Sequence, residues 1–397
     1  MLSIPLTSPC DDGSKGFGLY VHWPFCQSKC PYCDFNSHVR EDIDETAWAD
    51  AYCNEINFYK NFLNSSNPLT SIFFGGGTPS RMHPDTVERI INAAKNAFGL
   101  IDQAEITLEA NPTSTEADKF KAFRQAGVNR VSLGIQALND KDLAFLGRQH
   151  NAKEAMKAID IAASLFTRYS FDLIYARPEQ SLKDWEDELS LALSLTATHL
   201  SLYQLTIEEG TAFHTLYARK AFEIPNHEDA GLLYERTHEM TKEKGLIRYE
   251  ISNHALAGHH SRHNMTYWRY GDYIGVGPGA HGRLTKDHTH YATRAHRAPE
   301  IWLERVKCHG HGAHDFEIIP PQSAAEEYLM MALRTSEGVE LERLSALAEK
   351  TFDDFIDVER LNFLEQMTFI KRLGNQRLVA TDKGQQRLSS LLPQLLR

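Results

Sequence analysis

The fold of this chain is decided by Leu19-Tyr-Val-His-Trp-Pro-Phe-Cys26-Gln-Ser-Lys-Cys30-Pro-Tyr-Cys33, where an apolar strand runs into a loop with three cysteines. Three thiolates within eight residues can surround one metal centre, because the loop is short enough to converge and long enough to turn. A structural zinc ion would take a fourth ligand, which His22, Asp34 or His38 could supply. An iron–sulfur cluster held by three cysteines instead leaves one iron open to a small molecule. Spacing alone is compatible with both kinds of metal site.

A glycine turn after the next predicted strand helps to decide between them. The stretch Ser71-Ile-Phe-Phe-Gly-Gly-Gly-Thr-Pro79 is a strand that ends in consecutive glycines. Without Cβ atoms, this backbone can approach a ligand closely and aim its N–H groups at a carboxylate. Such a turn on its own is often structural. Its combination with a cysteine loop on the preceding strand favours a cluster that binds a small molecule.

Short apolar runs alternate with helical patterns from Leu19 to about Tyr203. This alternation predicts parallel strands joined by crossover helices, in an open doubly wound sheet or an incomplete barrel. The predicted strands are 19–23, 71–74, 105–108, 130–135, 169–174 and 199–203, and the predicted helices are 46–62, 84–98, 115–126, 152–165 and 182–195. We favour an α/β fold with an incomplete parallel (β/α)6 barrel, for a reason given by the site residues below.

The rest of the chain divides into further parts. We predict a lead at 1–17, the barrel at 18–250, a connecting region rich in His and Gly at 251–314, and a mostly helical C-terminal domain at 315–397. Within them we predict a helix at 229–244, a strand at 246–251 and a loop at 308–314. Three helical segments after Ala324, followed by a small hairpin around Gly374, resemble a winged helix.

The composition is that of an ordinary globular protein. The chain has 397 residues, of which 42% are hydrophobic and 24% charged, and its net charge is −11. Such an acidic chain is a poor binder of nucleic acid or anionic membranes, because both need a positive surface. No apolar run approaches the ~18–20 residues of a transmembrane helix, and no signal peptide precedes Gly16. We therefore expect a cytoplasmic protein whose cysteines serve metal binding rather than disulfides.

These motifs together resemble the radical S-adenosylmethionine (SAM) superfamily. Tyr20-Val-His-Trp-Pro-Phe-Cys26 and Gly75-Gly-Gly-Thr-Pro79 are similar to the branch of the oxygen-independent coproporphyrinogen III oxidases, and within it to the HemW-type haem chaperones. The resemblance implies that Cys26, Cys30 and Cys33 ligate a [4Fe–4S] cluster whose fourth iron is chelated by SAM. It further implies SAM contacts from Tyr20, Tyr32, Gly76, Gly77, Thr78, Glu109, Gln136, Arg148 and Asp172.

The residues themselves support this grouping. Gly75, Glu109, Gln136 and Asp172 lie at or near the C-terminal ends of four separate predicted strands. In parallel α/β folds that edge of the sheet is where ligands bind. A carboxylate that closes an apolar strand is also costly to bury without a partner. Their common edge is the reason for preferring the partial barrel.

A second motif points to haem. His263-Asn-Met-Thr-Tyr-Trp268 matches the HNxxYW motif that is associated with haem binding in HemW-type proteins. An imidazole is a good axial ligand for haem iron, and Tyr and Trp side chains can cover a porphyrin. His263 is therefore our candidate for the haem ligand.

Two departures separate the chain from the resembling oxidases. Phe35 stands where those enzymes carry a further cysteine, and only 25 residues precede Cys26. We therefore assign no catalytic residue and expect a haem chaperone that passes haem to acceptor proteins, with respiratory enzymes among the candidates, and that draws on an electron donor. The alternatives are an oxygen-independent coproporphyrinogen III dehydrogenase, or a radical SAM enzyme with another substrate. The C-terminal domain is acidic over 341–364, so we expect a lid over the barrel mouth or a docking domain for a partner, not a DNA-binding module.

Overall fold

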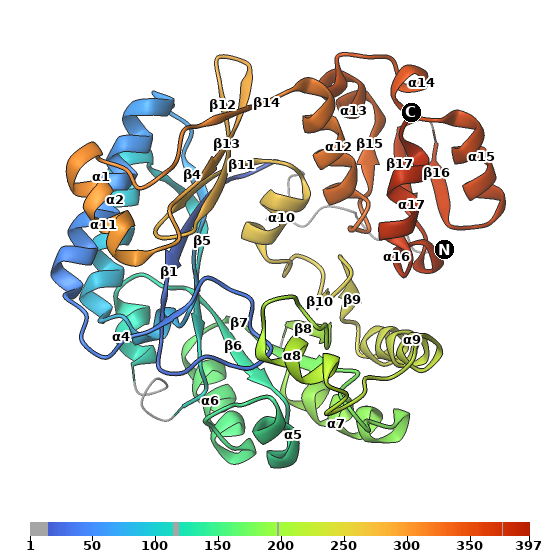
Figure 1. Ribbon diagram of the computed structural model, residues 1–397, viewed down its shortest axis with the longest axis horizontal. Coiled ribbons are helices and arrows are strands. Elements are labelled where there is room, and N and C mark those ends of the chain that lie inside the picture. The colour runs from blue at the N-terminus through green and yellow to red at the C-terminus, as the bar shows by residue number, and fades with distance from the viewer. Residues whose placement is uncertain (1–14, 114–118, 197, 375) are drawn as a thin grey trace.

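The computed structural model of the chain describes residues 15–113, 119–196, 198–374 and 376–397 (Figure 1). The predicted lead at 1–17 falls mostly outside these ranges, and so does Cys10. All of the parallel strands predicted from the sequence are confirmed, each within a few residues of its predicted ends. They are β1 (Phe17–Trp23), β4 (Leu69–Gly76), β5 (Leu100–Ala110), β6 (Arg130–Gln136), β7 (Arg168–Tyr175) and β8 (His199–Gln204).

The crossover helices lie outside the strands in Figure 1, and most of them begin at a capping side chain. Asn151 and Ser181 each form a capping box that satisfies the first free N–H groups of a helix. The helices are α1 (Glu45–Leu63), α2 (Pro84–Phe98), α4 (Phe120–Gln125), α5 (Asp140–Phe145), α6 (Ala152–Leu165) and α7 (Leu182–Leu195). The start of the helix predicted at 115–126 lies outside the described residues. Fully buried strand residues such as Val21, Ile72 and Leu108 form the core beneath these helices.

The predicted connecting region at 251–314 contributes strands to the same sheet. In it, β11 (Asp272–Val276) pairs in parallel with the outer side of β1. The region also contributes β10 (Asn253–Ala255), β12 (His281–Lys286) and β13 (Thr289–Arg294). The sheet is completed by β9 (Ile247–Arg248), just before this region, and by β14 (Glu317–Ile319), just after it. The complete order is β14-β13-β12-β11-β1-β4-β5-β6-β7-β8-β10-β9, so the barrel formed by the described residues is incomplete, as expected.

Two local predictions in this part were wrong. The strand predicted at 246–251 is reduced to the two residues of β9, because the chain turns at once into β10. The loop predicted at 308–314 begins inside α11 (Pro299–His309), which ends where Gly310 adopts a left-handed conformation. Neither segment has a regular alternation of apolar and polar residues along its sequence. The structure of each is therefore set by the elements that it contacts in the fold.

Three further helices surround the barrel: α8 (Ala212–Ala218), α9 (His227–Glu243) and α10 (Arg262–Trp268). The predicted helix at 229–244 corresponds to α9. Two short strands, β2 (Phe25–Cys26) and β3 (His38–Val39), and the 3-10 helix η1 (Pro79–Arg81) complete the barrel domain. None of the described helices is both long and apolar enough to cross a membrane.

The C-terminal domain has a core of its own and the predicted order of a winged helix. It contains helices α12 (Pro321–Ala332), α13 (Leu341–Ala348), α14 (Phe352–Phe355), α15 (Val358–Gln366), α16 (Asp382–Gln385) and α17 (Leu388–Leu395). Its small sheet has the order β15-β17-β16, with β15 (Val339–Glu340), β16 (Ile370–Leu373) and β17 (Arg377–Ala380).

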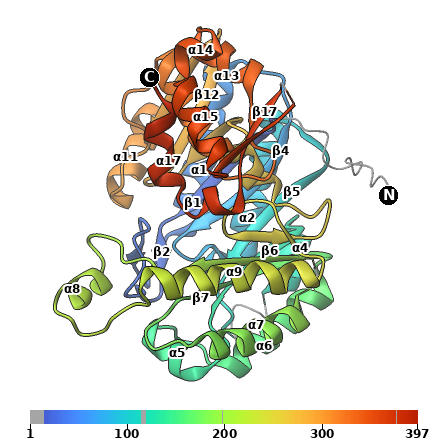
Figure 2. The same ribbon diagram turned by 90° about the vertical axis from the view of Figure 1, so that its right-hand side faces the viewer.

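This domain lies beside α10, at the end of the molecule away from α5, α6 and α7 (Figures 1 and 2). The Arg343 guanidinium, on α13, donates hydrogen bonds to the carbonyl oxygens of Arg269 and Tyr270, just after α10. Arg343 also shares a cavity with Gly16 and Phe17, where β1 begins. The domain therefore covers the base of the barrel, where the parallel strands start. The expectation that it closes the mouth as a lid was wrong.

Candidate cluster and cofactor site

The cysteine loop leaves the mouth end of β1 and is tied down at both of its ends. The N–H of His38 donates to the carbonyl oxygen of Pro24 at 2.7 Å, which closes the loop into the β2–β3 pair. The Asn36 amide nitrogen lies 2.9 Å from the carbonyl oxygens of both Pro278 and Arg297. These contacts hold the loop against a part of the chain more than 240 residues away.

The three cysteines are free thiols, with Cys26 buried and Cys30 and Cys33 half-buried. Burial raises the pKa of Cys26 and Cys33, so both thiols hold their protons at neutral pH in the metal-free chain. Metal ligation would therefore release protons. No group of three or more His, Cys, Asp or Glu in the described ranges converges on a single metal ion. All three thiols nevertheless line one cleft at the barrel mouth.

The glycine turn brings β4 against this loop. The N–H of Gly77 donates to Trp23 O at 2.7 Å, and the N–H of Thr78 donates to Phe25 O at 2.9 Å. A Cβ atom on Gly77 would lie 2.8 Å from that same Phe25 oxygen. These glycines, predicted to let a ligand approach the backbone, are also needed for the close packing of two backbone segments. The Thr78 hydroxyl donates to Cys26 Sγ at 3.4 Å, so the turn also contacts the thiol.

The cleft brings together every predicted SAM-site residue except Tyr20. Its walls include Tyr32, Gly76, Gly77, Thr78, Glu109, Gln136, Arg148 and Asp172 together with the three cysteines. Arg148 connects the two sets, because its Nη1 lies 3.2 Å from Cys30 Sγ and its Nη2 lies 2.6 Å from Asn111 Oδ1. Arg148 therefore contacts both one of the three cysteines and a polar side chain of the cleft wall.

Two carboxyl groups face each other across the cleft. Burial, and next the charge of Asp172, raise the pKa of Glu109 to about 8. Burial also raises the pKa of Asp172 to about 6, while a hydrogen bond from Ser201 and the charge of Arg130 limit the rise. Two partly desolvated carboxyls at one site favour a positively charged ligand, which would make both of them ionise.

Tyr20 lies below the cleft, in a cavity of about 200 Å³ inside the barrel that also contains Glu109 and Asp172. Its hydroxyl lies 3.0 Å from Nδ1 of His22, and Nε2 of His22 lies 2.8 Å from the carbonyl oxygen of Asn36. Burial lowers the pKa of His22 to about 4, so the ring is neutral. Because the carbonyl can only accept, Nε2 donates to it and Nδ1 accepts from Tyr20. Tyr20 thus supports the cysteine loop through His22.

His263 reaches the same interior cavity from below, on α10. Its side chain is buried, with Nδ1 2.9 Å from the Ser71 hydroxyl and Nε2 2.6 Å from the Tyr267 hydroxyl. Burial lowers the pKa of His263 to about 3, so the ring is neutral, and it stacks on Phe73 at 5.0 Å. A neutral imidazole is a competent metal ligand, but here both of its nitrogens are used within the protein.

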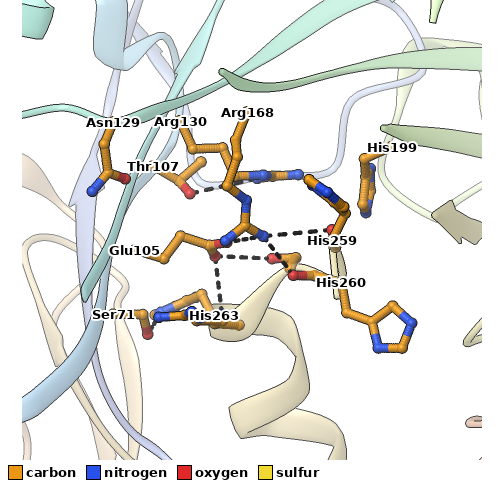
Figure 3. Close-up of polar contacts among 12 residues, drawn as sticks. Ser71, Glu105, Thr107, Asn129, Arg130, Arg168, His199, His259, His260 and His263 are labelled. Atoms are coloured by element: carbon orange, nitrogen blue, oxygen red, sulfur yellow. Dashed lines mark hydrogen bonds and ion pairs between the residues drawn. The ribbon is translucent and has the colours of Figure 1, made fainter. Parts of the chain in front are cut away.

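A buried ion pair holds α10 in this position (Figure 3). The Glu105 carboxylate lies 2.9 Å from Arg168 and accepts hydrogen bonds from the His263 N–H at 3.2 Å and the Ser261 hydroxyl at 3.5 Å. Burial alone would raise the pKa of Glu105, but the charges of Arg130 and Arg168 outweigh it and lower this pKa. The sequence pattern predicts only the start of a strand at Glu105; a carboxylate within an apolar run was the available signal for its role in this ion pair.

Asn111 and Ser132 also line the cleft, and neither was predicted from the sequence as a site residue. Asn111 belongs to the quoted run Leu108–Pro112, directly after Glu109, and its amide donates to the Thr78 hydroxyl at 3.3 Å. Ser132 lies on β6, and its side chain faces the carboxyl pair from the neighbouring strand. Position directly after a strand was the only signal for Asn111, and Ser132, which lies within β6, had no signal of this kind.

Known proteins resemble this chain in sequence and in fold. Residues 20–192 match the model of the Radical SAM superfamily. The chain is 40% identical to the bovine (Bos taurus) "Radical S-adenosyl methionine domain-containing protein 1, mitochondrial", across 82% of this chain and 75% of that protein. It is 36% identical to the "Heme chaperone HemW" of Haemophilus influenzae, across 85% of this chain and 88% of that protein. The Escherichia coli protein of the same name is 38% identical across 67% and 70% of the two chains.

A solved structure confirms the fold over nearly the whole chain. The coproporphyrinogen III oxidase HemN from Escherichia coli, described as a radical SAM enzyme, superposes with a TM-score of 0.79. The match covers 96% of this chain and 89% of the other at 18% sequence identity. At that identity the likeness is one of fold, and it includes the C-terminal domain as well as the barrel.

Proposed function

Because this chain belongs to the radical SAM superfamily, in the family of the HemW haem chaperones and the radical SAM domain-containing protein 1, we propose that it binds haem and transfers it to acceptor proteins. The observation that carries this proposal is the 36% identity to a HemW haem chaperone over 85% of the chain. The HNxxYW motif at His263–Trp268 supports it. A cytoplasmic location, protein acceptors and an electron donor are the further predictions that go with this function.

Membership of the superfamily implies a [4Fe–4S] cluster and SAM, and the residues of the cleft suit both. Cys26, Cys30 and Cys33 would hold three irons, with Arg148 and Thr78 placed to donate hydrogen bonds to the sulfurs. Bound there, a reduced cluster supplies one electron to the sulfonium of SAM. The protein orients the ligand and excludes water, and the Glu109–Asp172 pair offsets the positive charge of SAM.

His263 is the residue that the motif proposes as haem ligand. The neutral ring could bind iron through Nε2, provided that the Tyr267 hydroxyl leaves it. The cavity around His263 measures about 200 Å³, below the range of about 300–1,000 Å³ that is typical for small-molecule pockets. Haem binding at this position therefore requires α10 to move away from the barrel.

A titration of haem into the purified protein, followed at the Soret band, tests the proposed function. We expect saturable binding of about one haem per chain and transfer of the bound haem to an apoprotein acceptor. Absence of specific binding by the wild-type chain would overturn the proposal. Weakened binding by the His263→Ala variant that added imidazole restores would assign the ligand to His263.

The oxygen-independent coproporphyrinogen III dehydrogenase is the alternative predicted from the sequence. Phe35 lines the cleft and is 56% exposed, at the position where the resembling oxidases carry a further cysteine. Conversion of coproporphyrinogen to protoporphyrinogen by the reduced protein with SAM would establish this alternative.

A further inference from the structure

A second cavity lies at the base of the barrel, at the opposite end from the cysteine loop. It measures about 440 Å³, within the range of about 300–1,000 Å³ for small-molecule and cofactor pockets. The start of β1, the hairpin of β12 and β13, the segment after α10 and α13 of the C-terminal domain all contribute to its wall. The residues that the argument uses are Lys15, Tyr270, Asp272, Thr285, His290 and Arg343.

Side chains of this basal cavity fix the tautomer of His290. The Thr285 hydroxyl donates its single proton to Asp272 Oδ1 at 2.8 Å, and it lies 3.1 Å from Nδ1 of His290. Because that proton is already used, the Thr285 oxygen must accept the N–H of Nδ1. Nε2 of His290 then carries the lone pair. Metal-binding histidines are oriented in this way by hydrogen bonds to their other nitrogen.

Nε2 of His290 is available, in contrast to the nitrogens of His263. It has no hydrogen-bond partner among the residues that the structure describes. Burial lowers the pKa of His290, so the ring is neutral at neutral pH. The aromatic ring of Tyr270 lies 6.2 Å away and supplies an apolar neighbour. The cavity thus presents a half-buried imidazole with a free lone pair beside an aromatic side chain.

Two cations line the same wall. Arg343 donates hydrogen bonds to the carbonyl oxygens of Arg269 and Tyr270, and these acceptors carry no charge. Its guanidinium carbon lies 4.5 Å from the centre of the Tyr328 ring. Among the described residues, no carboxylate lies within ion-pair distance of Arg343 or Lys15. Burial, and next repulsion by Arg343, lower the pKa of Lys15. Asp272 in the same wall, whose carboxylate accepts hydrogen bonds from Thr285, and Glu340 outside the wall each offset part of this positive charge. Two cations that repel each other in a cavity favour an anionic ligand.

We propose that haem binds in this basal cavity, with Nε2 of His290 as ligand to the iron and with Lys15 and Arg343 facing the haem carboxylates. The inference rests on the proposed function, and it names the place of binding. The HNxxYW motif still contributes to this site, because α10, which contains the motif, ends two residues before Tyr270 in the cavity wall. His263 and Glu105 anchor that helix in the barrel, so they act on the cavity from a distance.

The test is a haem titration of the full chain and three variants, followed at the Soret band. We expect His290→Ala to weaken binding at least about tenfold, which is about 1.4 kcal/mol, and added imidazole to restore the spectrum of the wild type. The control is His288→Asn, an exposed neighbour in the same hairpin whose φ of 64° suits Asn. Wild-type affinity in His290→Ala, or imidazole rescue of His263→Ala instead, would overturn the inference. No binding by the wild type would overturn the proposed function itself.

An iron-free porphyrin separates the two kinds of contact. The Lys15→Glu variant should weaken binding of both haem and iron-free protoporphyrin, because it repels their carboxylates. The His290→Ala variant should weaken binding of haem and leave the iron-free porphyrin unchanged, because only haem has the bond to iron. Equal losses of both ligands in His290→Ala would make its role structural and contradict the assignment.

Discussion

The mouth and the base of the barrel use the same strands in opposite ways. At the mouth, two half-buried carboxyls and three thiols face a cleft that suits a cationic ligand and a metal cluster. At the base, two cations, the Asp272 carboxylate and a neutral imidazole face a cavity that we propose suits an anion with a metal ion. The contrast shows that a chain with a net charge of −11 can still carry a local positive site. The sign of a site depends on which charged side chains the fold places there, and not on the total charge of the chain.

The two ends also differ in how their residues are brought together. The mouth is made from short motifs that each follow one strand, so neighbours in the cleft are often neighbours in the sequence. The base has no such motif, and its residues come together through contacts between distant segments, such as the 2.9 Å contact of Ser71 with His263, 192 residues apart. At the mouth such distant contacts add to the local motifs, as the contact of Asn36 with Pro278 does. The following predictions test whether the ends are independent, from the largest expected effect to the smallest.

Replacing Cys26, Cys30 and Cys33 together by Ala should remove the cluster completely. After anaerobic reconstitution we expect about four irons and four sulfides per chain in the wild type and almost none in the variant. Cys308→Ala is the control, because Cys308 is exposed at the end of α11. If the two ends are independent, the triple variant binds haem with unchanged affinity. Stoichiometric zinc in the wild type, without iron uptake, would contradict the cluster.

Among substitutions near the base of the barrel, Glu105→Gln should lower the free energy of unfolding most. It leaves Arg168 and Arg130 without their counter-charge. Breaking a buried ion pair in this way costs about 3–5 kcal/mol, measurable by urea unfolding. The control is Glu179→Gln, whose carboxylate pairs with Lys141 at the surface and should cost under about 1 kcal/mol.

The same variant has a defined dependence on pH. The folded-state pKa of Glu105 is lowered, so its stabilising contribution is present above the unfolded pKa and is lost as the pH falls through the folded one. The stability difference between wild type and Glu105→Gln should therefore shrink in acid. A difference that stays constant down to pH 3 would show that the charge of Glu105 is not what holds α10.

SAM affinity at the mouth should fall as the pH falls below about 8. The pKa of Glu109 is about 8 in the free protein, and the positive sulfonium of SAM favours its ionised form, so binding below that pH must release a proton. The loss is at most about tenfold per pH unit, measured by calorimetry on reconstituted protein. The Glu109→Gln variant keeps every other titrating group of the wild type, and its SAM affinity should depend less steeply on pH. The same pH dependence of SAM affinity in the wild type and in Glu109→Gln would show that Glu109 does not contact SAM.

Tyr20→Phe should have the smallest effect, because it removes one buried hydrogen bond and leaves the ring in place. We expect a loss of about 1 kcal/mol in unfolding free energy, since Nδ1 of His22 then has no donor. The loss should come with faster iron release from the reconstituted protein, because His22 supports the loop through Asn36. Iron release at the wild-type rate would show that the loop does not depend on this contact.

The mouth could be predicted because its signals are local. The thiols of Cys26, Cys30 and Cys33 lie within one loop, Gly76 and Gly77 end one strand, and the buried strands alternate with helices at regular intervals. The strands of residues 251–314 gave no such signal, because Gly275 and Gly282 pack against neighbouring backbone where an alternating pattern would be expected. The position of the C-terminal domain at the base could not be predicted either, because it is set by long-range contacts such as the one between Arg343 and Tyr270.

The sequence by itself determined the family, the cysteine loop and the parallel α/β core, because spacing along the chain controls which groups a short loop or strand can bring together. Only the tertiary structure decided that both nitrogens of His263 are used inside the barrel, and that His290, Lys15 and Arg343 share one cavity. The physical reason is that side-chain hydrogen bonds and shared cavities join residues from separate elements, and no local pattern records which elements will meet.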